Sequence, residues 1–353
     1  MAKAYESDNR RFNVKEDVFF QAKQFSDFLR FIKLPSYFTD KSTITNVSRP
    51  WTYRESIGNR FNSFGKVSLH PVLFTQFGNN KGEQIVRSPV STLSILECSA
   101  MSQEVACNID LIMGLEQGVR GVDIRLYTQE LLDYIYNKDL TEYSVCAHLL
   151  ANFQKNSDIA LTFRSCGIIC RYVLNTPSVV YKNLAENADL LSVFGSGCEE
   201  WVSKIKQGLE LCEPGFLYYL ICKLLPTNSL ESITSLTRGL NEAYKLLGIE
   251  VNNLRTEAKS EFKILLAQIN KSQLRNIIKI SNSGYKNFEM INWDKASLPF
   301  DTLDLPPALL GDSSPIQIFP GVEKGLRTLD LEQLFEDMIE GQSWVERFSE
   351  ACA

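Results

Sequence analysis

The sequence predicts a mainly α protein, with a multi-helix globular body of one or two lobes, an N-terminal region of loops and short strands, and a C-terminal helical arm. Three observations predict this fold class. Apolar residues recur with a helical period between capping residues in the middle of the chain, prolines and glycines break the pattern before it, and an isolated amphipathic stretch follows a proline-rich segment near the end. The chain has 353 residues, 44% of them hydrophobic and 22% charged, so it can bury a substantial core.

Residues 1–90 form the first predicted region. The stretch 14–32 keeps a near-helical period of apolar residues and stops before Pro35. After it, short apolar pieces rich in valine, phenylalanine and threonine are interrupted by Pro71, Gly78 and Pro89. We expect loops here with one or two short strands.

Residues 91–291 form the predicted helical body. Thr128, and Thr176 followed by a proline, mark helix starts, and Ser196 with Glu199 forms a capping box. Gly248 marks a helix end. We expect about seven or eight helices joined by short polar connections. The sequence shows no repeat of fixed period, which argues against a solenoid.

Residues 292–325 form a predicted linker or strap. Residues 292–321 hold five prolines and four aspartates and show no regular period. Such a composition predicts an extended segment that lies across the body.

Residues 326–353 form a predicted acidic, amphipathic arm. Ser343 with Glu346 forms a further capping box, which predicts a separate short helix at the end. The arm docks either on its own body or on a neighbouring copy, and we favour the neighbouring copy, which makes the protein a homo-oligomer. The predicted oligomerisation residues lie on the apolar face of the arm: Leu331, Leu334, Phe335, Met338, Ile339 and Trp344.

Charge is distributed unevenly along the chain. Residues 1–90 hold 14 Lys/Arg and 8 Asp/Glu, a net of +6; residues 91–298 hold 20 and 23, a net of -3; residues 299–353 hold 3 and 11, a net of -8. A basic head and an acidic tail therefore flank a nearly neutral body.

The cysteines and the apolar stretches bear on compartment and cofactors. Nine cysteines without a Cys-x-x-Cys pair indicate reduced thiols in a cytoplasmic protein. Two pairs of residues have the side chains of zinc ligands and lie close in sequence, Cys146 with His148 and Cys166 with Cys170. Each pair lacks further ligands, so neither a metal nor another cofactor is expected. The longest apolar stretch, 215–225, contains Lys223 and is too short to span a bilayer, so no membrane is expected as a partner.

No motif predicts an enzyme. Serine or cysteine nucleophiles need a base, and the two histidines are His70, before a proline, and His148, within a predicted helix. No nucleophile elbow, phosphate-binding loop or zinc-protease motif occurs. Gly195 and Gly197 precede a helix, where a junction between two helices explains them better than a phosphate site. We expect a non-enzymatic protein.

The stretch 48–66 mixes cations with aromatic rings in a chain whose net charge is -5. Arginine binds phosphates and stacks on flat rings, and aromatic side chains give unpaired bases a platform. The alternative is that the rings anchor a long loop to the body while the cations reach solvent. The predicted nucleic-acid contacts are Arg49, Trp51, Tyr53, Arg54, Arg60, Phe61 and Lys66, with Arg120 and Arg125 from a glycine-rich stretch.

These features lead to two hypotheses of function. The first is a self-assembling protein that binds single-stranded RNA or another polyanion, in the manner of viral nucleocapsid or replication-compartment proteins; the comparison is one of parts, without a matched motif. The second is a cytosolic helical adaptor that binds a partner protein through its C-terminal arm or an apolar groove.

Overall fold

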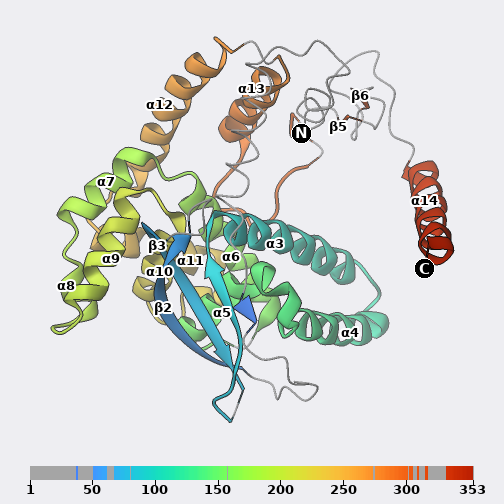
Figure 1. Cartoon of the computed structure of the whole chain (residues 1–353), viewed down its shortest axis with the longest axis horizontal. Coiled ribbons are helices and arrows are strands. Elements are labelled where there is room, and N and C mark those ends of the chain that lie inside the picture. Colours follow the sequence, from blue (N-terminus) through green and yellow to red (C-terminus); the bar gives the residue numbers. More distant parts are fainter. Residues whose placement is uncertain are drawn as a thin grey trace. The chain divides into compact units, whose positions relative to one another are not determined.

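The computed structural model describes residues 37–38, 51–61, 67–79, 81–156, 158–272, 275–300, 302–304, 308–309, 315–316 and 331–352 (Figure 1). The predicted helix over 14–32, together with Arg49 and Lys66, lies outside these residues. The chain divides into two compact units, one of Met1–Lys259 with Trp293–Ser297 and one of Ser260–Asn292 with Leu298–Ala353.

The first unit is mainly helical, which confirms the predicted fold class. Among the described residues, no helix is both long enough and apolar enough to cross a lipid bilayer. Short 3-10 turns, η1 and η2, cover Lys138–Leu140 and Ser229–Glu231. Its helices are α3 (Thr92–Met113), α4 (Gln117–Ile135), α5 (Thr141–Gln154), α6 (Ile159–Leu174), α7 (Ser178–Asn187), α8 (Leu190–Phe194), α9 (Glu199–Glu210), α10 (Pro214–Leu224), α11 (Ile233–Leu246) and the first part of α12 (Val251–Ile269).

An antiparallel sheet precedes the helices. Its strands lie in the order β1-β4-β3-β2, and the blue arrows of β2 and β3 run side by side in Figure 1. The N-terminal region holds strands as predicted, but more and longer ones than the one or two short strands expected, because three of them have 7 to 12 residues. Their bounds are β1 (Tyr37–Phe38), β2 (Thr52–Phe61), β3 (Val67–Gly78) and β4 (Gln84–Val90).

Among the described residues, the two prolines that suggested loops lie where a strand has a neighbour on one side only. β4 pairs with β3 from Leu73 onward, so Pro71 faces β2 alone, opposite Asn59. Pro89 pairs with Phe74 of β3, and the described residues of β1 pair with Val86 and Arg87 of β4. A proline is tolerated in a strand where no neighbour needs its missing N–H.

α6 is the centre of the helical core. It packs against α3, α5 and α10, and side chains on all of its faces are buried. The neighbouring helices approach closely: a Cβ on Gly167 would come within 1.9 Å of the Ser102 hydroxyl oxygen on α3. Fully buried thiols fill much of the remaining space, those of Cys98, Cys146, Cys166, Cys170 and Cys222. The eight cysteines between Cys98 and Cys222 are free thiols.

Several helix ends differ from the predicted ones. Thr128 lies inside α4, where its hydroxyl donates to the Ile124 carbonyl instead of capping a helix start. α9 begins at Glu199 without a side-chain cap from Ser196, and the Glu199 carboxylate instead accepts from the Gly197 N–H. Gly248 follows α11 with a φ of 79°, which confirms the predicted glycine end.

The start of the predicted strap lies against the helical body. Arg171 of α6 is buried, and its Nη1 donates to the carbonyls of Trp293 at 3.0 Å and Lys295 at 2.6 Å. The Tyr172 hydroxyl donates to Asp294 at 2.7 Å. α6 therefore holds the segment Trp293–Ser297 through backbone carbonyls, which lets an irregular segment lie buried with its polar groups bonded.

The second unit contains the rest of α12, α13 (Arg275–Met290), the short strands β5 (Ala308–Leu309) and β6 (Pro315–Ile316), and α14 (Leu331–Cys352). Phe262 of α12 meets the rings of Tyr285 and Phe288 of α13, with centroids 5.3 and 5.6 Å apart. α14 is one uninterrupted helix, so the predicted break at Ser343 is wrong.

Gly215→Ala tests the close packing between the sheet and α10. The added Cβ would lie 1.9 Å from the Val90 carbonyl oxygen, so backbone must move, and we expect the free energy of unfolding to fall by about 1–3 kcal/mol. The control is Gly121→Ala in α4, where no atom lies within 4 Å of the new Cβ. That change should raise the free energy of unfolding by about 0.5–1 kcal/mol. Urea denaturation followed by circular dichroism measures both, and equal effects would contradict the packing described.

Candidate binding pocket and the arginine-aromatic strand

The residues of the arginine-aromatic stretch that the structure describes lie on or beside β2. Arg54 is exposed and Tyr53 is half-buried, while the side chains of Arg60 and Phe61 lie outside the description. Trp51 differs from the prediction, because it is only 7% exposed. A ring buried to this extent cannot serve as an open platform for a base.

Trp51 belongs to an aromatic cluster that seats the sheet on the helices. Its ring centroid lies 5.3 Å from those of Phe77 on β3 and Tyr136 at the end of α4. It stacks on His148 of α5, with centroids 5.7 Å apart and 19° between the planes. For this residue the structure supports the anchoring role, and the indole Nε1 is buried without a hydrogen-bond partner among the described residues.

Arg120 and Arg125 lie on α4, an element separate from β2. The Nη2 of Arg120 donates to the Leu115 carbonyl at 2.9 Å, and the Nε of Arg125 donates to the Gly121 carbonyl at 3.0 Å. Each guanidinium therefore bonds a main-chain carbonyl four or five residues before it, which leaves fewer of its donors for a phosphate.

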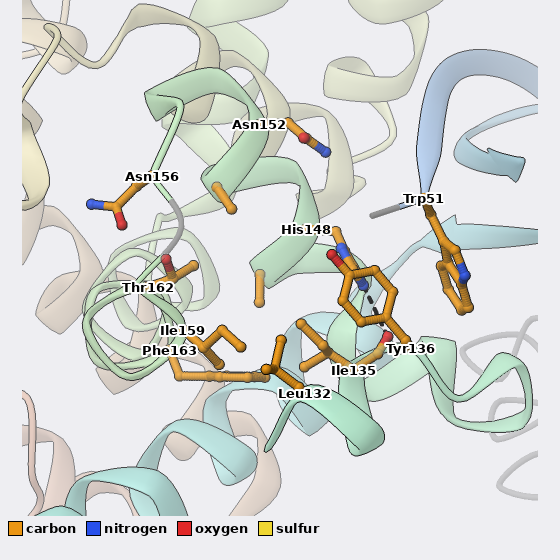
Figure 2. A pocket seen from close by; sticks show the side chains of 12 residues that line it. Trp51, Leu132, Ile135, Tyr136, His148, Asn152, Asn156, Ile159, Thr162 and Phe163 are labelled. Atoms are coloured by element: carbon orange, nitrogen blue, oxygen red, sulfur yellow. Dashed lines mark hydrogen bonds between the residues drawn. The ribbon is translucent and has the colours of Figure 1, made fainter. Parts of the chain in front are cut away.

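A pocket of about 270 Å³ opens beside Trp51, between α4, α5 and α6 (Figure 2). The small side chains of Ala147 and Ala151 on α5 form part of its lining, so little side-chain volume fills the space there. Its volume equals that of about nine water molecules, which is room for one planar ring system. The other lining residues are Trp51, Leu132, Ile135, Tyr136, His148, Asn152, Asn156, Ile159, Thr162 and Phe163.

The lining of this pocket carries no charged side chain. Burial lowers the pKa of His148 below its usual value, against the smaller effect of its hydrogen bond, so the imidazole is neutral near pH 7. Its Nε2 lies 2.9 Å from the Ile135 carbonyl, the bond drawn in Figure 2. A neutral, largely apolar pocket with amide groups at Asn152 and Asn156 fits an uncharged ring.

Charges near the pocket balance one another along the chain. Lys138 follows Tyr136 closely and Lys155 precedes Asn156, but Asp139 and Asp158 stand beside them. The Asp158 carboxylate caps α6 by accepting from the Leu161 N–H. The surroundings therefore offer no strong attraction for a polyanion by themselves.

The structure gives both histidines structural partners. The ring of His70 on β3 pairs with the Glu213 carboxylate at the start of α10, which ties the sheet to that helix. His148 bonds a main-chain carbonyl. Within the described ranges, no group of three or more His, Cys, Asp or Glu side chains could hold a metal ion.

Sequence reasoning missed most of the pocket. Trp51 and His148 were the lining residues it considered, whereas Tyr136, Asn152 and Asn156 come from the ends of two helices. Asn152 lies in the last turn of α5, whereas Asn156 follows the helix after Lys155, whose φ is 51°, so no helical spacing in the sequence relates the two asparagines.

The predicted oligomerisation residues of the arm that have described side chains are all exposed. Phe335 is 58%, Met338 57%, Ile339 51% and Trp344 62% exposed. The side chains of Leu331 and Leu334 lie outside the description. α14 thus presents large apolar side chains to solvent along two to three turns, and its sequence also holds six acidic residues and one arginine.

Trp51→Ala tests the anchoring role. Loss of a buried indole should lower the free energy of unfolding by about 3–5 kcal/mol, because the aromatic cluster loses its central ring. Arg54→Ala, at an exposed position of the same strand, should change it by less than about 0.5 kcal/mol. Denaturant titration measures both variants, and a stable Trp51→Ala protein would show that this side chain is dispensable to the fold.

Comparison with protein-family models, curated proteins and solved structures finds no match to this chain.

Proposed function

We propose that the protein is a non-enzymatic, self-assembling protein that binds single-stranded RNA or another polyanion, as viral nucleocapsid and replication-compartment proteins do. The observation that carries this proposal is α14, a helix of 22 residues whose described apolar side chains are all more than half exposed. A contiguous set of exposed apolar side chains marks a surface for association.

The energetics of α14 favour docking over a free helix in water. An isolated helix gains little stability from its own hydrogen bonds, and most helical stability in proteins comes from packing an apolar face. Burying Phe335, Met338, Ile339 and Trp344 could contribute about 1.5–3 kcal/mol each before ordering costs. That sum is enough to hold a subunit contact.

Two observations support the RNA-binding part of the proposal. Arg54 is exposed on β2, in the region of the chain whose net charge is +6. The pocket beside Trp51 takes an uncharged ring, so a base could enter it while the phosphates stay outside with the cations. Since the charges around the pocket balance, affinity must come mainly from the cations of β2 and of the residues before it.

The adaptor hypothesis is favoured by a different surface. α3 and α4 form a helical hairpin (Figure 1), joined by a hydrogen bond from Asn108 to the Tyr127 hydroxyl at 3.2 Å. The end of this hairpin exposes many large apolar side chains, which fits a hydrophobic groove of a partner protein. They are Leu111, Met113, Leu115, Val119, Val122, Ile124 and Leu126.

Deletion of residues 326–353 tests self-assembly. If α14 joins subunits, the truncated protein should keep its helical circular dichroism and form a smaller oligomer, because the first unit has a core of its own. Light scattering after size-exclusion chromatography gives the mass. An unchanged mass, or loss of folding, would make α14 an element of its own subunit.

Titration with unstructured RNA tests the polyanion part. We expect a dissociation constant in the micromolar range or tighter. The logarithm of the association constant should fall linearly with the logarithm of the salt concentration, because phosphate contacts release counterions. Changing Arg49, Arg54 and Arg60 together to alanine should flatten that slope. A matched control removes three exposed cations elsewhere, Lys182, Arg238 and Lys245. An equal loss of RNA affinity in both triple variants would indicate a general effect of charge. If the unchanged protein does not bind RNA at low salt, the adaptor hypothesis is favoured.

A further inference from the structure

The α12–α13 hairpin of the second unit buries too little apolar surface to be a complete core. Among its described side chains, Phe288 is buried at 7% exposure and the aromatic contacts of Phe262 join the two helices. Other large apolar side chains of the hairpin are 42–62% exposed: Ile264, Leu265, Ile277, Ile280 and Met290. Two helices that share one thin seam normally need a third element to cover them.

The charges of the hairpin and of α14 are opposite. Residues 260–292 hold five Lys/Arg and two Glu, a net of +3. α14 holds six Asp/Glu and one Arg, a net of -5. Lys263 and Lys279 are exposed directly before Ile264 and Ile280, so cations accompany the apolar side chains on both helices. The Nζ of Lys286 lies 2.6 Å from a carboxylate oxygen of Asp304, so this lysine is not taken as a contact for α14.

We propose that α14 of one copy packs on the α12–α13 hairpin of a second copy and completes a three-helix bundle between subunits. This inference rests on the proposed self-assembly and names the surface that receives the arm. α13 has 16 residues and α14 has 22, so they are about 24 and 33 Å long and can pack along most of their lengths. Apolar side chains fill the seam and acidic residues face the lysines.

A second copy is the occupant because the proposed self-assembly requires a contact between subunits, and the arm and the hairpin carry opposite net charges. The apolar side chains of α14 and those of the hairpin are exposed in one and the same chain. The contact is heterologous, since the arm and the hairpin are different surfaces, and such contacts build rings when they close and filaments when they do not. One such contact per subunit suffices to extend an assembly.

Charge reversal in two separate variants tests this inference. One variant carries Lys263→Glu and Lys279→Glu on the hairpin, and the other carries Glu336→Lys and Glu340→Lys on α14. Each variant alone should associate at least about tenfold more weakly than the unchanged protein, because like charges then face each other. Mixed together, the two should form a complex, because the lysine-bearing arm meets the glutamate-bearing hairpin. Lys182→Glu with Lys245→Glu, in the first unit, is the control and should leave association unchanged.

The outcomes separate this inference from the proposed self-assembly. If deletion of 326–353 reduces the oligomer but the hairpin variant associates normally, the arm docks elsewhere and the inference is wrong. If the mixture stays dissociated but all four changes in one chain restore a compact monomer, the arm closes its own subunit and the inference is wrong. If the unchanged protein is monomeric at every concentration, both proposals fail.

Discussion

The close approach of α3 and α6 is the constraint on which the first unit depends. α6 is buried on all sides, so it needs small side chains where it meets its neighbours. Gly167 of α6 stands against Ser102 of α3, and the small thiols of Cys166 and Cys170 occupy positions where larger side chains would otherwise lie. Arg164 of α6 is half-exposed, whereas Arg171 is buried. The Nη1 of Arg171 donates to carbonyls of the segment Trp293–Ser297, which makes the return of the chain from α13 part of the same core.

The same choice of small residues explains the pocket. α5 contacts α3 and α6, and alanines at 147 and 151 allow those contacts without filling the space toward α4. The sheet closes one side through Trp51, whose ring is fixed by Phe77, Tyr136 and His148. The pocket is thus a consequence of how sheet and helices meet, and its lining holds no charged side chain.

How much the sequence predicts depends on whether the signal is local. Helices were predicted because period and caps are read within a few residues, and Gly248 ends α11 as expected. The long strands were not predicted, because whether a strand tolerates Pro71 or Pro89 depends on which neighbouring strand lies beside that proline. The break expected at Ser343 is absent because residues on both sides of it favour a helix and nothing stops α14 there. The pocket joins Trp51 to the stretch 132–163, a contact between distant parts of the chain that no local pattern encodes.

Charge connects the proposed assembly with the proposed binding of a polyanion. An acidic arm and a basic head in one chain attract each other, and an unengaged α14 would compete with phosphates for the cations of residues 1–90. An arm that packs on the hairpin of a second copy places its acidic residues against Lys263 and Lys279 instead. Assembly would then remove a competitor from the basic region of each subunit, so association and polyanion binding would favour one another although their surfaces are separate.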